Sequence, residues 1–329
     1  MPALTTMQAD HGQVRRPRLI DPDFVRAAAT GLLLGAWVAG VGVALYATVF
    51  KGSAFGMDSH AYWVAGRMAN PYHAAPGAED AFLYSPLFAQ VMRPLSLLPW
   101  PMFGWFWVAI DGAAVIWLIQ PLAMRWRIPV LLLCIPEVQV GNIHGLLALA
   151  LVLALSQPAY AAFAVLTKIA PAAPTVMWFV ARGEWRKLLA LATMTLTLVT
   201  VSFALSPYLW MAWGHFLLAH RGEGSGLIAK FVAAIAITLV GARRNWVWLL
   251  PVAVCIALPM DGVSLHGLVV LTAIPRLLAV FRQGSSAADA HVGPLEPQVR
   301  DSSPIATFWS KPTNLARRQD PTLGNEEFH

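Results

Sequence analysis

Residues 27–50 read AAATGLLLGAWVAGVGVALYATVF, twenty-four residues without a single charged side chain. The hydrocarbon core of a bilayer is about 30 Å thick and is crossed by about 20 apolar residues in a helix. This stretch is therefore long enough to span a membrane. It has no small-residue cleavage site and is too long for a signal peptide core. Basic residues precede it, which favours a cytoplasmic N-terminus and an uncleaved signal anchor: Arg15, Arg16, Arg18 and Arg26.

The composition of the whole chain agrees with a membrane protein. Of the 329 residues, 57% are apolar and 12% are charged, whereas a soluble domain carries roughly 25% charged residues. The short alternating segments of a β-barrel are missing from the sequence. The net charge of +6 comes from basic residues at the ends of apolar runs, so it is not a nucleic-acid signal. Cys134 and Cys255 lie inside apolar runs, which favours buried thiols over a disulfide.

A segment of mixed polarity, residues 51–101, follows the first apolar run. Its prolines and polar residues make it unsuited to span a membrane. Loops of more than about 15 residues in compact proteins are usually functional or disordered, and aromatic side chains that favour the membrane interface argue against disorder here: Tyr62, Trp63, Tyr72, Tyr84 and Trp100. We expect an ordered extracytoplasmic loop with one or two helices lying on the membrane surface.

The remaining apolar runs alternate with basic clusters, which predicts an all-α polytopic protein. We expect about 8–10 transmembrane helices within a domain at residues 27–281, preceded by a cytoplasmic segment at 1–26. Residues 282–329 are rich in Ser, Asp, Pro and Gln, which predicts a disordered cytoplasmic tail. Between residues 128 and 180 the apolar pattern is interrupted, and the number of spans there is open: two long broken helices or four short ones. The expected breaks are at Pro136-Glu137, Gly141-Asn142, Gln157-Pro158 and Lys168 to Pro171.

Several ionisable residues lie in or beside apolar runs, where each costs about 2.5 to 3.5 kcal/mol at a helix centre. Asp58, Glu137 and Asp261 fall at the extracytoplasmic ends of helices in the predicted topology. Lys168 lies there too if its segment is split, but near mid-membrane if the segment is one helix. Asp111 is nearer the middle of its run, and Arg276 lies in the inner half of the last span. Such residues are functional candidates by default.

Structural explanations stay open for three of these residues. Asp58 is suited to cap a helix that starts at Ser59. Lys168 has a structural alternative as the ion-pair partner of Glu137, and Asp111 as an intramembrane hydrogen-bond partner. A metal site is conceivable from residue types alone, without a supporting spacing, from Asp58, His60, His73, Glu79 and Asp80. We expect no metal and no cofactor, and motifs of soluble enzymes such as a phosphate-binding glycine loop or His-Glu-x-x-His are missing from the sequence.

The order of these features resembles a known family. Asp58 follows the first span with Tyr62 and Trp63 behind it, and further matching motifs come in sequence order: Tyr84-Ser85-Pro86, Leu98-Pro99, Gln139-Val140-Gly141-Asn142, Lys168-Ile169-Ala170-Pro171 and Ser264-Leu265-His266. Over residues 30–280 the chain is similar to the integral membrane glycosyltransferases of the GT-C fold class. It most resembles actinobacterial mannosyltransferases of phosphatidylinositol mannosides and lipomannan, which use polyprenyl-phosphate-mannose. It departs from them in having the Gln before the Gly at the helix break and in a shorter C-terminal half.

The resemblance implies an inverting transfer of mannose, or of a related sugar such as arabinofuranose, to a cell-envelope glycolipid outside the plasma membrane. Asp58 would be the general base. The donor phosphate would be bound by Lys168, Arg221 and His266, and the sugar or acceptor by His60, Tyr62, Tyr84 and Asn142. Membrane lipids, the lipid-linked donor and the glycolipid acceptor are the implied partners, with no nucleic acid.

Two other functions are open at this point. A flippase for lipid-linked sugars, or a solute transporter, would use intramembrane charges along a route through the membrane, including Asp111 and Arg276. An inactive, truncated relative that acts as a scaffold would need none of them for chemistry.

Overall fold

The structure is a computed structural model and describes residues 22–50, 55–220, 227–258 and 265–281. Within these ranges the chain is all-α, with helices and short 3-10 turns and no strand. The predicted all-α membrane fold is confirmed. Arg221, Asp261 and the predicted tail at 282–329 lie outside the described residues, as does the predicted N-terminal segment up to residue 21.

Three described helices are long and apolar enough to cross a membrane: α1 (Pro22–Phe50), α4 (Trp100–Ile119) and α9 (Trp185–Leu205). A fourth span is formed if α5 (Met124–Val140) and α6 (His144–Ser156) are counted as one, because they are bent by 114° at a short break. The other apolar helices in this part of the chain are shorter. The expected number of 8–10 spans therefore stays a prediction.

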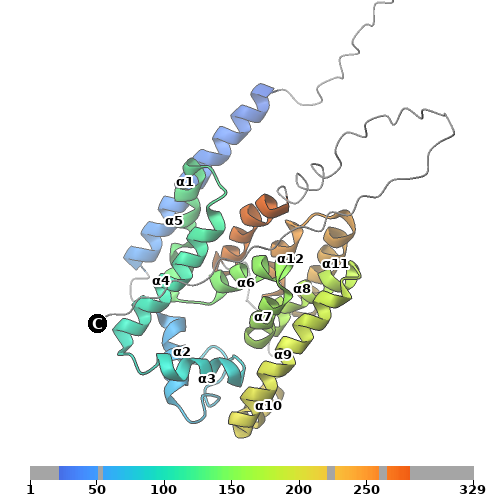
Figure 1. Cartoon of the computed structure of the whole chain (residues 1–329). Coiled ribbons are helices and arrows are strands. Elements are labelled where there is room, and N and C mark those ends of the chain that lie inside the picture. The colour runs from blue at the N-terminus through green and yellow to red at the C-terminus, as the bar shows by residue number, and fades with distance from the viewer. Residues whose placement is uncertain (1–21, 51–54, 221–226, 259–264, 282–329) are drawn as a thin grey trace, which may run out of the picture. The chain divides into compact units, whose positions relative to one another are not determined.

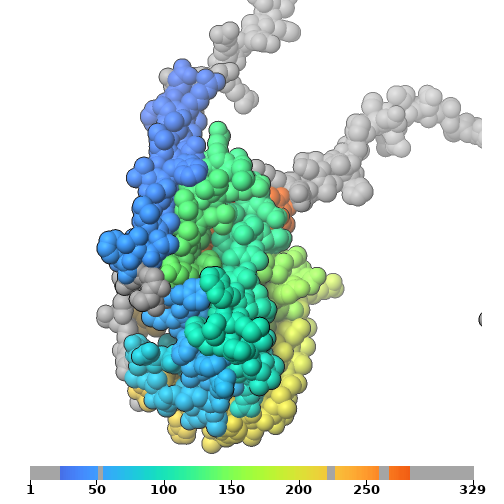
Figure 2. Space-filling model, turned by 90° about the vertical axis from the view of Figure 1, so that its left-hand side faces the viewer, coloured from blue at the N-terminus to red at the C-terminus, as the bar shows by residue number. Residues whose placement is uncertain are grey.

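Helix α1 lies along α5 at the edge of the bundle (Figures 1 and 2). Among residues 23–50 of this helix, only Gly40 and Ala47 are buried. Gly40 allows this contact, because a Cβ there would lie 2.9 Å from the carbonyl oxygen of Pro129. The rest of α1 exposes large apolar side chains, which suits a helix surrounded by lipid.

Residues 55–99, which precede α4, are ordered, as predicted, and contain two helices, α2 (Met57–Arg67) and α3 (Pro86–Leu95). They pack together with α10 (Pro207–Ala219), which follows α9, and the three lie at the same end of the bundle (Figure 1). Aromatic side chains fill the contact, including Tyr62, Tyr84, Phe88 and Phe216. We refer to α2, α3, α10 and the residues between α2 and α3 as the aromatic lobe.

The interrupted region forms four helices and a short turn: α5, α6, η2 (Pro158–Tyr160), α7 (Ala161–Thr167) and α8 (Ile169–Ala181). Two of its breaks follow from proline. Pro158 is the first residue of η2 and Pro171 lies in the first turn of α8. Each lacks the N–H that would bond to the carbonyl four residues earlier, which is tolerated best in the first turn of a helix and therefore favours a new start there. The expected break at Pro136 is wrong, since α5 runs through Pro136 to Val140. The helix ends instead at Gly141, whose φ of 74° is a left-handed conformation that favours glycine.

The C-terminal part of the bundle packs on α6 and α8. It contains α11 (Leu227–Arg244), α12 (Leu249–Ala257) and η3 (Leu265–Thr272), which leads into a last helical stretch ending at Phe281. Arg276 in this stretch donates to the carbonyl oxygen of Trp117 at 2.7 Å and to Oε1 of Gln120 at 2.8 Å. Its guanidinium is thus bound to the C-terminal end of α4.

Candidate active site

The site lies where three segments meet: the start of α2, the break between α5 and α6, and the break between α7 and α8. The start of α2 is bound to the end of α5, because the N–H of Gly56 donates to the carbonyl oxygen of Gln139 at 2.8 Å. Ser59 in the first turn of α2 is fully buried against Gly141, where a Cβ would lie 2.5 Å from the Ser59 hydroxyl oxygen. The glycine therefore serves both the left-handed turn and the close approach of α2.

This contact brings Asp58 next to the α5–α6 break. Helix α2 begins at Met57 and its N-cap residue is Gly56, so the alternative in which Asp58 caps a helix starting at Ser59 is wrong. Asp58 lies in the first turn, half-buried, where a carboxylate is favoured by the helix dipole. The side-chain amide of Asn142 donates to Oδ2 of Asp58 at 2.5 Å.

The amide group of Asn142 connects Asp58 with Lys168. Its Oδ1 accepts from the N–H of Ile143 at 2.7 Å and from Nζ of Lys168 at 3.4 Å. Both of these partners are donors and the carboxylate of Asp58 is an acceptor, so the network allows one orientation of the amide. Lys168 itself is the single extended residue between α7 and α8.

Behind Lys168 lie two residues that are almost completely buried, His144 at the start of α6 and Glu137 in the last turn of α5. Nζ of Lys168 lies 2.8 Å from Nε2 of His144, and Nδ1 of the same ring contacts Oε1 of Glu137. We name the connected residues Asp58, Asn142, Lys168, His144 and Glu137 the polar chain. Asp58, Glu137 and His144 lie in the terminal turns of helices, and Asn142 and Lys168 lie between helices.

Tyr84 and Tyr62 form the wall of the site on the side of the aromatic lobe. Nζ of Lys168 lies 5.8 Å from the centre of the Tyr84 ring, and the hydroxyl oxygens of Tyr62 and Tyr84 are 2.9 Å apart. Burial raises the pKa of both phenols well above the ordinary value, and the nearby Asp58 carboxylate raises it further. Both hydroxyls therefore remain protonated hydrogen-bond donors at neutral pH.

The remaining residues that were predicted for the site are His60, Arg221 and His266, and the structure does not bring them to the polar chain within the described residues. His60 is two residues after Asp58 in α2 and therefore points to a different side of the helix; its Nδ1 lies 2.6 Å from Oδ1 of Asp80, and its ring is in edge contact with Trp100. His266 lies in η3, but nothing is described of its side chain. The structure thus brings together Asp58, Asn142, Lys168, Tyr62 and Tyr84 among the predicted residues.

Sequence reasoning missed His144 altogether and considered Glu137 as one of several functional candidates in apolar runs and as a direct partner of Lys168. A signal was present, because a histidine two residues after a Gly-Asn break in an apolar run is an intramembrane ionisable residue. Asp111, the deepest predicted carboxylate, is not in the polar chain. It is fully buried in α4 against Gly145, in electrostatic contact with the main-chain amides of Gly145 and Leu146, although neither of its oxygens makes a hydrogen bond of normal geometry within the described residues.

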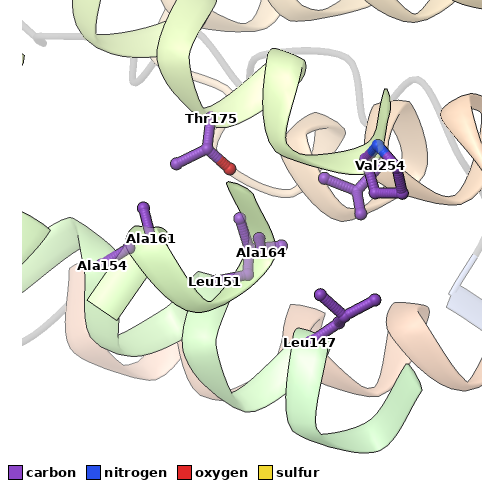
Figure 3. Close-up of a pocket in the computed structure, with 8 residues that line it drawn as sticks. Leu147, Leu151, Ala154, Ala161, Ala164, Thr175 and Val254 are labelled. Atoms are coloured by element: carbon purple, nitrogen blue, oxygen red, sulfur yellow. The ribbon is translucent and has the colours of Figure 1, made fainter. Parts of the chain in front are cut away.

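Two hollows lie near the polar chain. The first is an apolar groove of about 480 Å³ between α4 and α5, lined by residues that run from Phe55 and Gln139 beside the site to Ile128 near the start of α5. The second is a cavity of about 10 Å³ among α6, α7, α8 and α12, on which Leu147, Ala164, Thr175 and Val254 converge (Figure 3). A cavity of this size holds at most one water molecule, so of these two hollows the groove is the one large enough for part of a substrate.

Among the described residues no group of three or more His, Cys, Asp and Glu side chains is arranged to hold a metal ion. Of the five residues considered for a metal site, His60 and Asp80 contact each other. The chemistry that the described site offers is that of a carboxylate and an ammonium group that are connected by hydrogen bonds to one amide.

The fold and the site define an all-α membrane protein with a compact polar cluster at helix breaks. Residues 82–290 match the family model of Glycosyltransferase family 87, which is more than half of the chain. The chain belongs to this family of glycosyltransferases. Among curated proteins and among solved structures, no similar protein was found. The match includes Tyr84, Glu137, Asn142, His144 and Lys168, whereas Asp58 precedes it.

Proposed function

We propose that the protein transfers a mannosyl or related residue from a polyprenyl-phosphate-linked donor to a lipid-anchored acceptor, with inversion, at the extracytoplasmic face of the plasma membrane. The single observation that carries this proposal is the connection of the Asp58 carboxylate to the Lys168 ammonium group through Asn142. Membership in a glycosyltransferase family supplies the reaction class. The polyprenyl donor and the mannosyl group rest on the sequence resemblance.

In this reaction the acceptor hydroxyl oxygen attacks C1 of the sugar as Asp58 removes its proton. The bond between C1 and the phosphate oxygen breaks, and its electron pair leaves with the lipid phosphate. Lys168 stabilises the negative charge that develops on this phosphate, because an ammonium group in a site of low dielectric acts strongly on a developing anion. A single base suffices, because a phosphate is a good leaving group and needs little help from an acid.

Other predicted residues complete the proposed site. The phenol groups of Tyr62 and Tyr84 form the wall next to Lys168 and would bind the sugar or acceptor. His60, whose ring contacts Asp80 and Trp100, would bind the acceptor from outside the polar chain.

The carboxylates of Asp58 and Glu137 offset the positive charge of Lys168. Arg221 and His266 would add positive charge around the donor phosphate. The groove between α4 and α5 is lined almost wholly by apolar side chains and ends beside the site, so it suits the polyprenyl tail of the donor.

The geometry does not favour a transport route. Such a route needs Asp111 and Arg276 along one path, yet Asp111 is buried against α6 and Arg276 is bound to the C-terminal end of α4. We therefore retain glycosyl transfer as the proposed function.

The test uses purified protein in lipid nanodiscs with polyprenyl-phosphate-mannose and, separately, polyprenyl-phosphate-arabinofuranose as labelled donors. Phosphatidylinositol mannosides are the acceptors. We expect a new glycosidic product with wild-type protein and a loss of about 10² to 10⁴-fold for Asp58→Asn, which removes the general base. Asp23→Asn, an exposed carboxylate of α1, is the matched control and retains the wild-type rate. Transfer by Asp58→Asn at the wild-type rate, or no product with either donor, would overturn the proposal.

A further inference from the structure

The contacts of Lys168 determine which atoms carry protons. A lysine ammonium group has three N–H donors and no acceptor, and Nζ of Lys168 lies 2.8 Å from Nε2 of His144. With Lys168 protonated, Nε2 must accept, so the proton of the neutral imidazole is on Nδ1. The Nδ1–H then donates to the carboxylate of Glu137, which it contacts. One arrangement of protons therefore satisfies all three side chains.

The order of Lys168, His144 and Glu137 also affects the stability of the charged form of Lys168. A buried ammonium group loses the hydration that stabilises it, and a nearby carboxylate compensates for that loss. The ring of His144 lies between the carboxylate of Glu137 and the ammonium group of Lys168. The negative charge of Glu137 therefore stabilises the ammonium group on the side of His144. On the other side, the amide oxygen of Asn142 lies 3.4 Å from Nζ. Within the described ranges, two of the three N–H bonds of Lys168 have these acceptors, which leaves the third for a ligand.

We propose that His144 and Glu137 are positioning residues that keep Lys168 protonated and direct its remaining N–H to the phosphate of a lipid-linked sugar donor. This inference rests on the proposed function, since it assigns the phosphate of that donor to Lys168. Neither residue contacts the substrate. Glu137 fixes the tautomer and orientation of His144, and His144 fixes Nζ of Lys168. This corresponds to the way a second carboxylate orients a histidine in many metal and triad sites.

Two substitutions separate charge from geometry. Glu137→Gln keeps an oxygen that accepts from Nδ1–H of His144 but removes the negative charge. The ionisable groups around Nζ are Glu137 from α5, His144 from α6, Asp58 from α2 and Tyr84 from the aromatic lobe. Removing the charge of Glu137 makes the ammonium form less favourable, so the alkaline limb of the pH–rate profile moves to lower pH. His144→Gln removes the ring and lowers kcat/KM about 100-fold, the loss expected when a charged group is misplaced by about 1 Å.

Matched controls come from the same chain. Glu184→Gln removes a carboxylate that pairs with Arg182 and Lys187 outside the polar chain, and His215→Gln replaces an exposed histidine of α10. Both retain the wild-type rate and pH profile. A double-substitution cycle identifies the route of the effect: in a Lys168→Ala background, His144→Gln lowers the rate no further, because His144 acts through Lys168.

A binding measurement tests the inference apart from turnover. Undecaprenyl phosphate is titrated against protein in nanodiscs, and we expect about tenfold weaker binding for His144→Gln and for Lys168→Ala than for wild type, on the scale of a lost charge-assisted hydrogen bond. The inference is overturned if His144→Gln and Glu137→Gln match wild type in rate, pH profile and lipid-phosphate binding while Asp58→Asn is inactive. If wild-type protein forms no glycosidic product, the proposed function fails, and the binding comparison still decides whether His144 positions Lys168.

Discussion

The side-chain amide nitrogen of Asn142 lies 2.5 Å from Oδ2 of Asp58, although 84 residues separate them in the chain. The same amide group accepts a hydrogen bond from Lys168 on its oxygen side. One neutral side chain thus holds a carboxylate and an ammonium group at opposite ends. The amide of Asn142 therefore lies between Asp58, the base that must receive a proton, and Lys168, the cation that must remain charged.

Replacement of Asn142 by alanine should therefore disconnect the two charged groups. We expect Asn142→Ala to lower kcat/KM for glycosyl transfer about 100-fold, because Asp58 and Lys168 are no longer held in one geometry. Gln157→Ala is the matched control, an exposed amide at the break between α6 and η2, and it retains activity. Initial rates of product formation measure both. A rate for Asn142→Ala close to that of wild type would show that the amide does not orient the base.

The buried phenols of the aromatic lobe predict a pH dependence of stability. Burial raises the pKa of Tyr62, Tyr72 and Tyr84. A group whose pKa is raised on folding stabilises the folded state fully below its unfolded pKa, which is about 10 for tyrosine, and this contribution is lost as the pH rises above it. The stability of the lobe should therefore be constant up to about pH 10 and decrease above it.

Ultraviolet titration of the phenols measures this directly. We expect the curves of wild type and of the variant Tyr62→Phe with Tyr84→Phe to coincide up to about one pH unit above the ordinary tyrosine value of about 10. They should diverge only where thermal denaturation shows that the wild-type lobe unfolds. Ionisation of Tyr62 or Tyr84 in folded protein near pH 10 would contradict the burial of their hydroxyls.

Gly145 of α6 packs closely against Asp111 of α4. A Cβ at this position would fall well inside contact distance of the Asp111 carboxylate, which is completely buried. Gly145→Ala should therefore lower the unfolding free energy by about 1 to 3 kcal/mol through overpacking. Gly35→Ala in α1 is the control, because a Cβ there meets nothing within 4 Å.

Thermal denaturation in nanodiscs compares the two glycine variants. In the double variant Gly145→Ala with Asp111→Ala, the carboxylate that causes the clash is absent. The combined loss should be smaller than the sum of the single losses, as for residues in direct contact. Equal midpoints for Gly145→Ala and Gly35→Ala would disprove the close packing of the two helices.

Much of the fold could be predicted because the membrane imposes length and composition on each span. The apolar run at residues 27–50 predicted α1, and the proline at position 171 predicted the helix break at Lys168. The helix end near Gly141 was also predicted, because glycine and asparagine are both suited to a left-handed turn. Pro136 was misjudged because neighbouring packing supports a proline inside a membrane helix.

The polar chain could be predicted only in part. Asp58, Asn142 and Lys168 were candidates, but their contacts depend on the bend of 114° between α5 and α6, which no local pattern specifies. That bend also places His144 beside Lys168. The sequence separates the two residues by 24 positions and two helices, so periodicity within one helix contains no information about their contact.

The groove between α4 and α5 leads to a prediction about the length of the donor lipid. Gly112 lines this groove, and a Cβ there has 3.7 Å to its nearest neighbour, Val138, so a phenylalanine would project into the open space. Loss of the contacts of two buried methylene groups costs about 1.6 kcal/mol, which is more than a tenfold loss of affinity. Gly112→Phe should therefore raise KM about tenfold for a donor with a full polyprenyl tail.

A donor with a short, two-unit isoprenoid tail provides the comparison, since its sugar phosphate reaches the polar chain without filling the groove. For this donor, Gly112→Phe and wild type should have the same kcat and KM. Gly35→Phe adds the same bulk to an open position of α1 and should leave both donors unaffected. Because only the long-chain donor contacts the groove, a selective rise in KM would locate the tail between α4 and α5. An equal effect on both donors would instead mean that the substitution disturbs the site itself, and no effect on either would place the tail elsewhere in the bundle.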